Sequence, residues 1–132
     1  MAGPFVYIGH HRIKDGKREE ALRNARAVVD LVREREPQML AFDFFVNSDG
    51  TAMTVVQIHP DVASMDTHMG VIREHLENFS DYLEITGVGV YGEGTDDFVG
   101  ALREITGAGA ALDVKNTWLG GISARHRQEL PA

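Results

Sequence analysis

The sequence predicts an α+β fold with the ferredoxin-like order βαββαβ, an antiparallel sheet, and a C-terminal helix and arm. Two patterns carry this prediction. Alternating apolar residues, typical of strands, and apolar residues at three- and four-residue spacing, typical of helices, follow one another in that order. The length of 132 residues is usual for one domain. We expect residues 1–92 to form this domain and residues 93–132 to pack on it.

The first strand and helix have clear boundaries. Residues 5–13 are predicted to form a strand, because both of its faces carry apolar side chains. Residues 17–36 carry apolar residues at helical spacing, and Pro37 ends this helix because the residue before a proline disfavours helical geometry. The run Arg33-Glu34-Arg35-Glu36 is interpreted as a solvated helix end.

A hairpin follows. Residues 39–46 and 51–59 are predicted strands, and Asn47-Ser48-Asp49-Gly50 between them is typical of a hairpin turn. Asp61 is then a candidate N-cap for a second helix.

The apolar stripe of the second helix is predicted to continue to residue 83. Its members repeat at spacings of four and three residues: Met65, Met69, Ile72, Leu76, Phe79 and Leu83. Gly70 is a candidate kink or split. Gly87 is expected to end the segment, and residues 88–91 to form a short fourth strand.

The remainder of the chain is predicted in less detail. Thr95 opens another helix, which Gly107-Ala108-Gly109 is expected to break. Residues 111–123 are compatible with an extended arm, and residues 124–132 with a frayed terminus. The arm is too apolar for a free tail, so we expect it to pack on the domain, across a dimer or over a pocket mouth.

Composition disfavours several functions. The net charge of −7 disfavours nucleic acids and anionic membrane surfaces as partners. The absence of cysteine excludes disulfides, thiolate metal sites and cysteine nucleophiles. Met1-Ala2-Gly3-Pro4 lacks the features of a signal peptide, so a cytoplasmic location is expected.

The predicted sheet has one face that its helices do not cover. Both helices of a βαββαβ unit lie on the same face, yet the first two strands are apolar on both faces. An exposed apolar face of this kind is typical of an interface. We therefore predict a homodimer formed through the open face of the sheet.

Three segments resemble the dimeric α+β barrel superfamily, and within it the antibiotic biosynthesis monooxygenase-like group. They are RIKDGKREEAL at 12–22, the Pro37 break with LAFDFFV after it, and TVVQIHPDVASMDTHM at 54–69. The similarity covers about residues 5–92. It implies a homodimer whose two sheets form a barrel, with an aromatic substrate held between sheet and helices.

The resemblance also implies an activity. Enzymes of the group oxidise aromatic or polyketide-like molecules with oxygen, without a metal or flavin, so no cofactor is expected. Gln57-Ile58-His59 stands where relatives often have Glu-x-Trp. The first strand has no Asn, and the only Trp, Trp118, lies outside the domain, so a haem oxygenase is disfavoured.

Three residues are candidates for catalysis. The resemblance places His68 where many members keep a helix histidine, and a histidine at the edge of an apolar stripe can act as a base near pH 7. One of His10 and His11 must face the helix-covered side, because neighbouring strand residues alternate; His10 is the candidate. Tyr7 could orient a substrate through its phenol. Alternatively, these side chains are ordinary edge, core or interface residues.

Seven residues are candidates for substrate binding, because their aromatic, imidazole or thioether groups suit a flat apolar ligand. They are His59, His75, Phe42, Phe44, Met65, Met69 and Tyr91. Plain core packing explains them about equally well. No metal site is predicted, since the sequence lacks HxH and HExxH motifs.

The sequence thus predicts a cofactor-independent monooxygenase with an apolar or aromatic small-molecule ligand. Two alternatives remain open: a non-catalytic ligand-binding or stress-related dimer of the same fold, and a cyclase or isomerase acting on a similar substrate.

Overall fold

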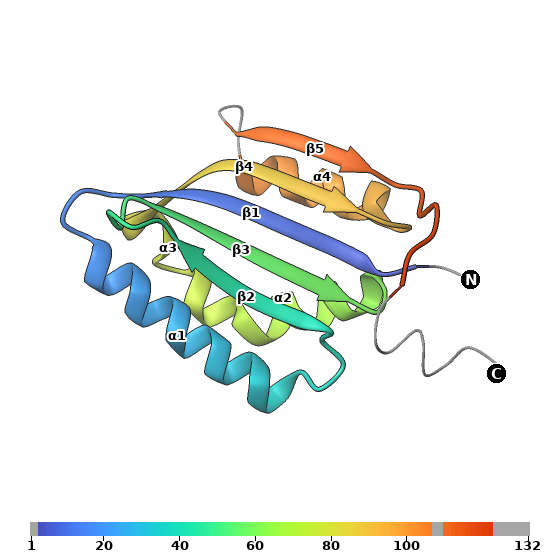
Figure 1. Cartoon of the computed structure of the whole chain (residues 1–132), viewed down its shortest axis with the longest axis horizontal. Helices are drawn as coiled ribbons and strands as arrows, with labels where there is room; N and C mark the ends of the chain where they lie inside the picture. The colour runs from blue at the N-terminus through green and yellow to red at the C-terminus, as the bar shows by residue number, and fades with distance from the viewer. Residues whose placement is uncertain (1–2, 107–109, 123–132) are drawn as a thin grey trace.

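A computed structural model describes residues 3–106 and 110–122, and its arrangement is shown in Figure 1. The elements in chain order are β1 (Phe5–Ile13), α1 (Arg18–Arg35), β2 (Ala41–Val46), β3 (Ala52–His59), α2 (Val62–Leu76), α3 (Phe79–Tyr82), β4 (Leu83–Tyr91), α4 (Thr95–Thr106) and β5 (Ala111–Lys115). The strands form one sheet in the order β2-β3-β1-β4-β5. The predicted α+β fold and its βαββαβ core are confirmed.

Local signals explain several of the boundaries. The Asn47 carboxamide oxygen accepts the backbone N–H groups of Thr51 and Ala52 in the β2–β3 turn. Gly50 has a φ of 71°, which a residue without a side chain adopts easily. The Asp61 carboxylate accepts the backbone N–H of Ser64 at 3.0 Å, as predicted for an N-cap.

The predicted second helix is wrong as one continuous element, because α2 ends at Leu76, the short helix α3 covers Phe79–Tyr82, and β4 begins at Leu83. Leu83 fits both the helical stripe and the alternation of a strand. It lies in a strand because Leu83 and Ile85 pair with β1. Consequently β4 begins at Leu83 rather than at residue 88, and Gly87 lies within the strand instead of ending the segment. Gly70 lies inside α2, which continues on both sides of it.

The C-terminal part adds to the same sheet. Strand β5 pairs with β4 in parallel, so the predicted antiparallel sheet becomes a five-stranded mixed one. The chain then returns toward the N-terminal end of β1, as Figure 1 shows, and the Trp118 ring lies against Gly3 with no room for a Cβ there. Residues 107–109, expected to break the helix, and residues 124–132, expected to fray, lie outside the described residues.

The core lies between the sheet and the helices. Its largest cluster joins Phe5 of β1, Met65 of α2, and Phe98 and Leu102 of α4. A second cluster joins Ala21 and Ala25 of α1 to Met53 of β3, and side chains of α1, α2 and α4 line the same cavity, so all three helices pack on one face of the sheet. Among the described residues, no helix is long and apolar enough to cross a membrane.

The other face of the sheet is apolar at its centre and polar at its border. Val6 and Ile8 of β1 stand opposite Ile58 and Val56 of β3, all four only partly buried. Phe45 of β2 is 59% exposed. At the border, Arg12 and Glu84 form an ion pair at 2.7 Å, and Tyr91 donates a hydrogen bond to Asp113. This face has the composition that the sequence led us to expect of an interface.

Candidate active site

A cavity of about 170 Å³ lies between the sheet and the helices. Side chains from β1, β2, β3 and β4 form one wall, and side chains from α1, α2, α3 and α4 form the other. Most of the lining is apolar, including Val28, Met65 and Ile72. The partly exposed residues Asn24 and His75 lie at its edge, between α1 and the end of α2. Such a cavity is the usual form of a small-molecule site.

Three side chains cross the sheet wall of the cavity in one row. The strand register pairs Tyr7 of β1 with Gln57 of β3, and Gln57 with Phe42 of β2, and all three line the cavity. An amide therefore lies between two aromatic rings in this wall.

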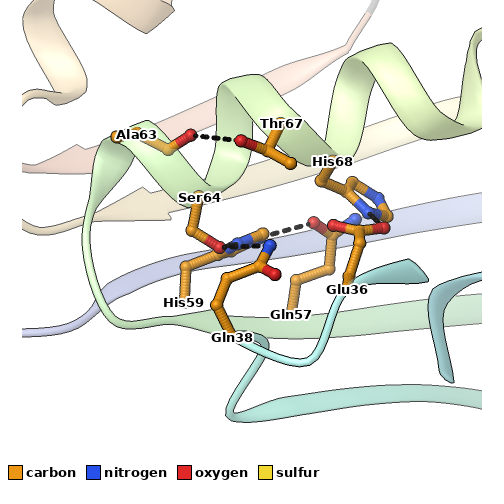
Figure 2. Close-up of polar contacts among 8 residues, drawn as sticks. All are labelled: Glu36, Gln38, Gln57, His59, Ala63, Ser64, Thr67 and His68. Carbon is orange, nitrogen blue, oxygen red and sulfur yellow. Dashed lines mark hydrogen bonds and ion pairs between the residues drawn. The ribbon is translucent and has the colours of Figure 1, made fainter. Parts of the chain in front are cut away.

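A buried carboxylate and imidazole face each other above this row. His68 of α2 lies with its Nδ1 at 2.8 Å from an Oε2 of Glu36, just after α1, and neither side chain is exposed (Figure 2). The His68 ring lies 5.2 Å from the ring of Phe42, measured between centroids. Nε2 of His68 is buried and has no hydrogen-bond partner among the described residues, although His68 lines the cavity.

Burial sets the protonation of this pair. It raises the pKa of Glu36 to about 7, against the opposing hydrogen bond from Gln38. It lowers the pKa of His68 to about 4. Above pH 7 the pair therefore holds a carboxylate and a neutral imidazole, whose Nδ1–H donates to Glu36. Nε2 is then unprotonated and able to accept a proton from a molecule in the cavity.

A second polar chain runs beside the pair. His59 of β3 contacts the Ser64 hydroxyl through Nδ1 at 2.7 Å and the Gln57 carbonyl oxygen through Nε2 at 3.0 Å (Figure 2). Gln38 donates to Ser64 at 3.3 Å. The rings of His59 and His68 lie 5.8 Å apart. Within residues 3–106 and 110–122, no three histidine or carboxylate side chains are placed to hold a metal ion.

Comparisons with known proteins give structural likeness only. No protein-family model matches the chain, and no curated protein sequence matches it. The crystal structure of MupZ from Pseudomonas fluorescens has a TM-score of 0.73 at 15% identity, covering 93% of this chain and 97% of MupZ. A crystal structure named antibiotic biosynthesis monooxygenase has a TM-score of 0.58 at 23% identity, covering 65% of this chain and 94% of the other.

A putative antibiotic biosynthesis monooxygenase from Bacteroides thetaiotaomicron gives a TM-score of 0.57 at 18% identity, covering 63% of this chain and 85% of that one. The chain therefore shares the α+β fold of these proteins. At these identities the likeness establishes the fold alone. The expected resemblance is thus confirmed at the level of the antibiotic biosynthesis monooxygenase-like fold.

The structure brings most of the predicted site residues to the cavity. Seven of them line it: Tyr7, Phe42, Phe44, Met65, His68, Met69 and His75. His59 is fully buried behind this lining, where it holds Gln57. Their roles in binding and catalysis stay predictions.

Two predicted residues lie on the wrong face of the sheet for this cavity. His10 is exposed and contacts the Thr54 hydroxyl at 2.9 Å, and its neighbour His11 takes the place in the cavity wall instead. Tyr91 donates to Asp113 on the same open face as His10. Strand alternation is the reason, because Tyr7 and His11 share the helix-covered face of β1 and His10 cannot.

Sequence reasoning also missed two residues of the site. Glu36, interpreted as part of a solvated helix end, is only 3% exposed, because α1 packs beside α2 and the Glu36 carboxylate lies against His68. In the sequence, Gln57 stands out only as a departure from the Glu-x-Trp pattern of relatives. A signal for Gln57 existed, since it lies two residues from His59 on an apolar strand face. No signal in the sequence pairs Glu36 with His68, which is 32 residues away.

Proposed function

We propose that this chain is a cofactor-independent monooxygenase of a small aromatic molecule, with His68 as its base. The observation that carries the proposal is the buried Glu36–His68 pair, because His68 lines a mostly apolar cavity and its Nε2 has no partner among the described residues. A carboxylate on one ring nitrogen fixes the tautomer and stabilises the imidazolium that forms when the other nitrogen takes a proton. The names of two structural neighbours agree with this chemistry.

The proposed reaction begins with proton transfer from the substrate to Nε2 of His68. The electron-rich carbanion or phenolate that remains reacts with molecular oxygen, which is the oxidant. For a phenol, one molecule of substrate and one molecule of oxygen give one para-quinone and one molecule of water. One oxygen atom becomes the new quinone carbonyl oxygen, and the other leaves as water with the phenolic hydrogen and the hydrogen of the oxidised ring carbon. The enzyme's part is to form and shelter the anion.

The cavity limits the size of the substrate. An apolar cavity of ~150 Å³ in another protein holds benzene, so the 170 Å³ here suits one substituted ring or a compact bicyclic molecule. A longer polyketide would have to extend past Asn24 and His75 at the edge of the cavity. We therefore expect small quinols and substituted phenols to be turned over first.

Oxygen uptake tests the proposal. Wild-type protein is given a panel of quinols and phenols, and oxygen consumption is followed together with product formation. His68→Ala should lower kcat by a factor on the order of 10²–10⁴, the usual contribution of a general base. His10→Ala, on the opposite face, should retain wild-type rates.

Other outcomes of the same assay distinguish the alternatives. Conversion that depends on His68 but consumes no oxygen would indicate a cyclase or isomerase. Saturable binding with no conversion would indicate a ligand-binding protein. Equal turnover by wild type and His68→Ala would contradict the assigned base.

We further propose that the open face of the sheet binds a second copy of the chain. The partly buried Val6, Ile8, Val56 and Ile58, with the exposed Phe45, form an apolar centre surrounded by charged pairs. Light scattering at micromolar concentration should give the mass of a dimer. Val56→Lys, which puts a charge at the centre of the contact, should give a folded monomer; a monomeric wild type would contradict the proposal.

A further inference from the structure

The polar chain behind the cavity has a defined direction. Gln38 donates its side-chain N–H to the Ser64 oxygen. The Ser64 hydroxyl then has its own proton to donate, and the described acceptor within reach is Nδ1 of His59, at 2.7 Å. Nδ1 is therefore the unprotonated nitrogen of the His59 ring.

The direction continues to Gln57. Burial lowers the pKa of His59 to about 4, so its ring is neutral at pH 7 and carries one N–H. With Nδ1 occupied as an acceptor, that proton is on Nε2, which donates to the carbonyl oxygen of Gln57 at 3.0 Å. Ser64 and His59 together fix which end of the Gln57 amide faces His59.

The other end of the amide is left for the cavity. Gln57 lines the cavity between Tyr7 and Phe42, and its oxygen is held on the His59 side. Figure 2 shows its amide nitrogen pointing away from His59, to the side of the Glu36–His68 pair. The cavity wall thus presents an N–H donor close to the proposed base.

We infer that Gln57 donates a hydrogen bond to the anionic oxygen of the bound substrate, with Ser64 and His59 as positioning residues. The inference rests on the proposed function and narrows its substrate class to phenols and enolisable ketones, whose deprotonation places negative charge on oxygen. A donor that is already oriented costs no rearrangement when this charge develops. His68 takes the proton and Gln57 stabilises what remains.

The charges are consistent with this division. Before reaction the site holds one negative charge, on Glu36. After proton transfer Glu36 and the His68 imidazolium form a neutral pair, and the single negative charge lies on the substrate oxygen. The net charge of the buried site is unchanged, so the anion needs local hydrogen bonds rather than an additional cation.

The test is the ionisation of a bound nitrophenol, whose absorbance separates phenol from phenolate without turnover. In wild type, the pKa of the bound nitrophenol should lie about one to two units below that of the free compound, as expected for a charge-assisted hydrogen bond. Gln57→Glu keeps an oxygen for His59 but loses the N–H group, and Gln57→Met has similar length and no donor. Both variants should abolish the lowering.

A second pair of variants tests the positioning residues. Ser64→Ala removes the proton that holds Nδ1, so His59 and the Gln57 amide can reverse, and the lowering should shrink. Ser64→Thr, which keeps the hydroxyl, should restore it. Circular dichroism and thermal melting establish that each variant is folded, and Ser64→Ala retains the backbone N–H that Asp61 caps.

The outcomes are separable from those of the oxygen-uptake assay. Equal lowering in wild type, Gln57→Glu and Gln57→Met would overturn the inference, as would a wild type that fails to bind nitrophenol or binds it without lowering its pKa. A His68-dependent oxygen uptake would leave the proposed function standing in each of those cases. A wild type that binds the phenolate with a lowered pKa but consumes no oxygen would contradict the proposed monooxygenase function and leave the role of Gln57 standing.

Discussion

Two adjacent histidines show how differently the two faces of this sheet behave. His10 is exposed on the open face and contacts the Thr54 hydroxyl. His11, on the covered face, is 6% exposed, and burial lowers its pKa to about 4. The Glu36–His68 pair is buried among the helices on the covered side of the sheet, whereas ion pairs on the open face, such as Arg12–Glu84, are exposed.

The difference teaches that burial, rather than residue type, gives this protein its unusual titrating groups. A strand places neighbouring residues in opposite surroundings without any other change. The open face therefore supplies matched controls for the covered one. The predictions below change one face and compare it with the other.

The largest expected effect concerns Glu36. Glu36→Gln keeps the shape of the side chain but removes the charge that stabilises the His68 imidazolium, so kcat should fall by a factor on the order of 10²–10³. Stability at pH 8 should not fall, because the raised pKa of Glu36 means that its ionised form is disfavoured in the folded state. Glu84→Gln, on the open face, is the control for kcat.

Oxygen-uptake kinetics and urea unfolding at pH 8 check this pair of expectations. Unchanged kcat in Glu36→Gln would remove the carboxylate from the proposed mechanism. A large loss of stability would show that the pair is structural.

The second effect is the pH dependence of stability. The pKa of His11 is lowered from 6.5 to about 4 in the folded state, so the unfolded chain binds the proton first. The contribution of His11 to the free energy of unfolding is fully present above pH 6.5. It is lost as pH falls toward 4, which lowers the free energy of unfolding by about 3 kcal/mol. His59 and His68 act in the same direction, and Glu36 in the opposite one.

Urea unfolding of two variants at pH 7 and pH 4 measures the share of His11. The His11 ring packs against Phe79, and a phenyl ring can take its place. His11→Phe should therefore lose less stability between these pH values than wild type. His10→Phe should retain the wild-type slope. Parallel curves for wild type and His11→Phe would contradict the assignment.

The contrast between the faces also marks what the sequence could predict. Alternation identified the strands, the open apolar face and the apolar cavity residues, because these depend on patterns within a few residues. It left open whether His10 or His11 faces the cavity, and our choice of His10 was wrong. Alternation along one strand separates its residues into two faces, but it does not show which of these faces the helices cover.

The Glu36–His68 pair depends on a contact between residues that lie far apart in the sequence. Glu36 follows three charged residues, a pattern that is typical of a solvated end, and only the packing of α1 beside α2 buries it. The extent of β4 failed for a related reason, since Leu83 suits both a helix and a strand and long-range pairing with β1 decides. Local patterns contain no record of such pairings.

A smaller effect is the pH dependence of catalysis. The proposed base form exists when the Glu36–His68 pair has lost one proton, which occurs near pH 7. The rate kcat should therefore rise with pH and level off above about 7, falling about tenfold per unit below it. In Glu36→Gln this limb should disappear. A wild-type rate that is flat from pH 5 to 8 would contradict the pair as the proton acceptor.

The smallest effect compares one substitution on the two faces. Ala25→Leu places additional carbon atoms in the cavity, and affinity for single-ring ligands should fall about tenfold, or ~1.4 kcal/mol, because ligand and side chain compete for the same space. Ala41→Leu, on the open face of β2, should leave that affinity unchanged. Calorimetric titration with a small phenol measures both. Equal affinities in the two variants would mean that the ligand binds outside the cavity, and a loss confined to Ala41→Leu would move the binding site to the open face.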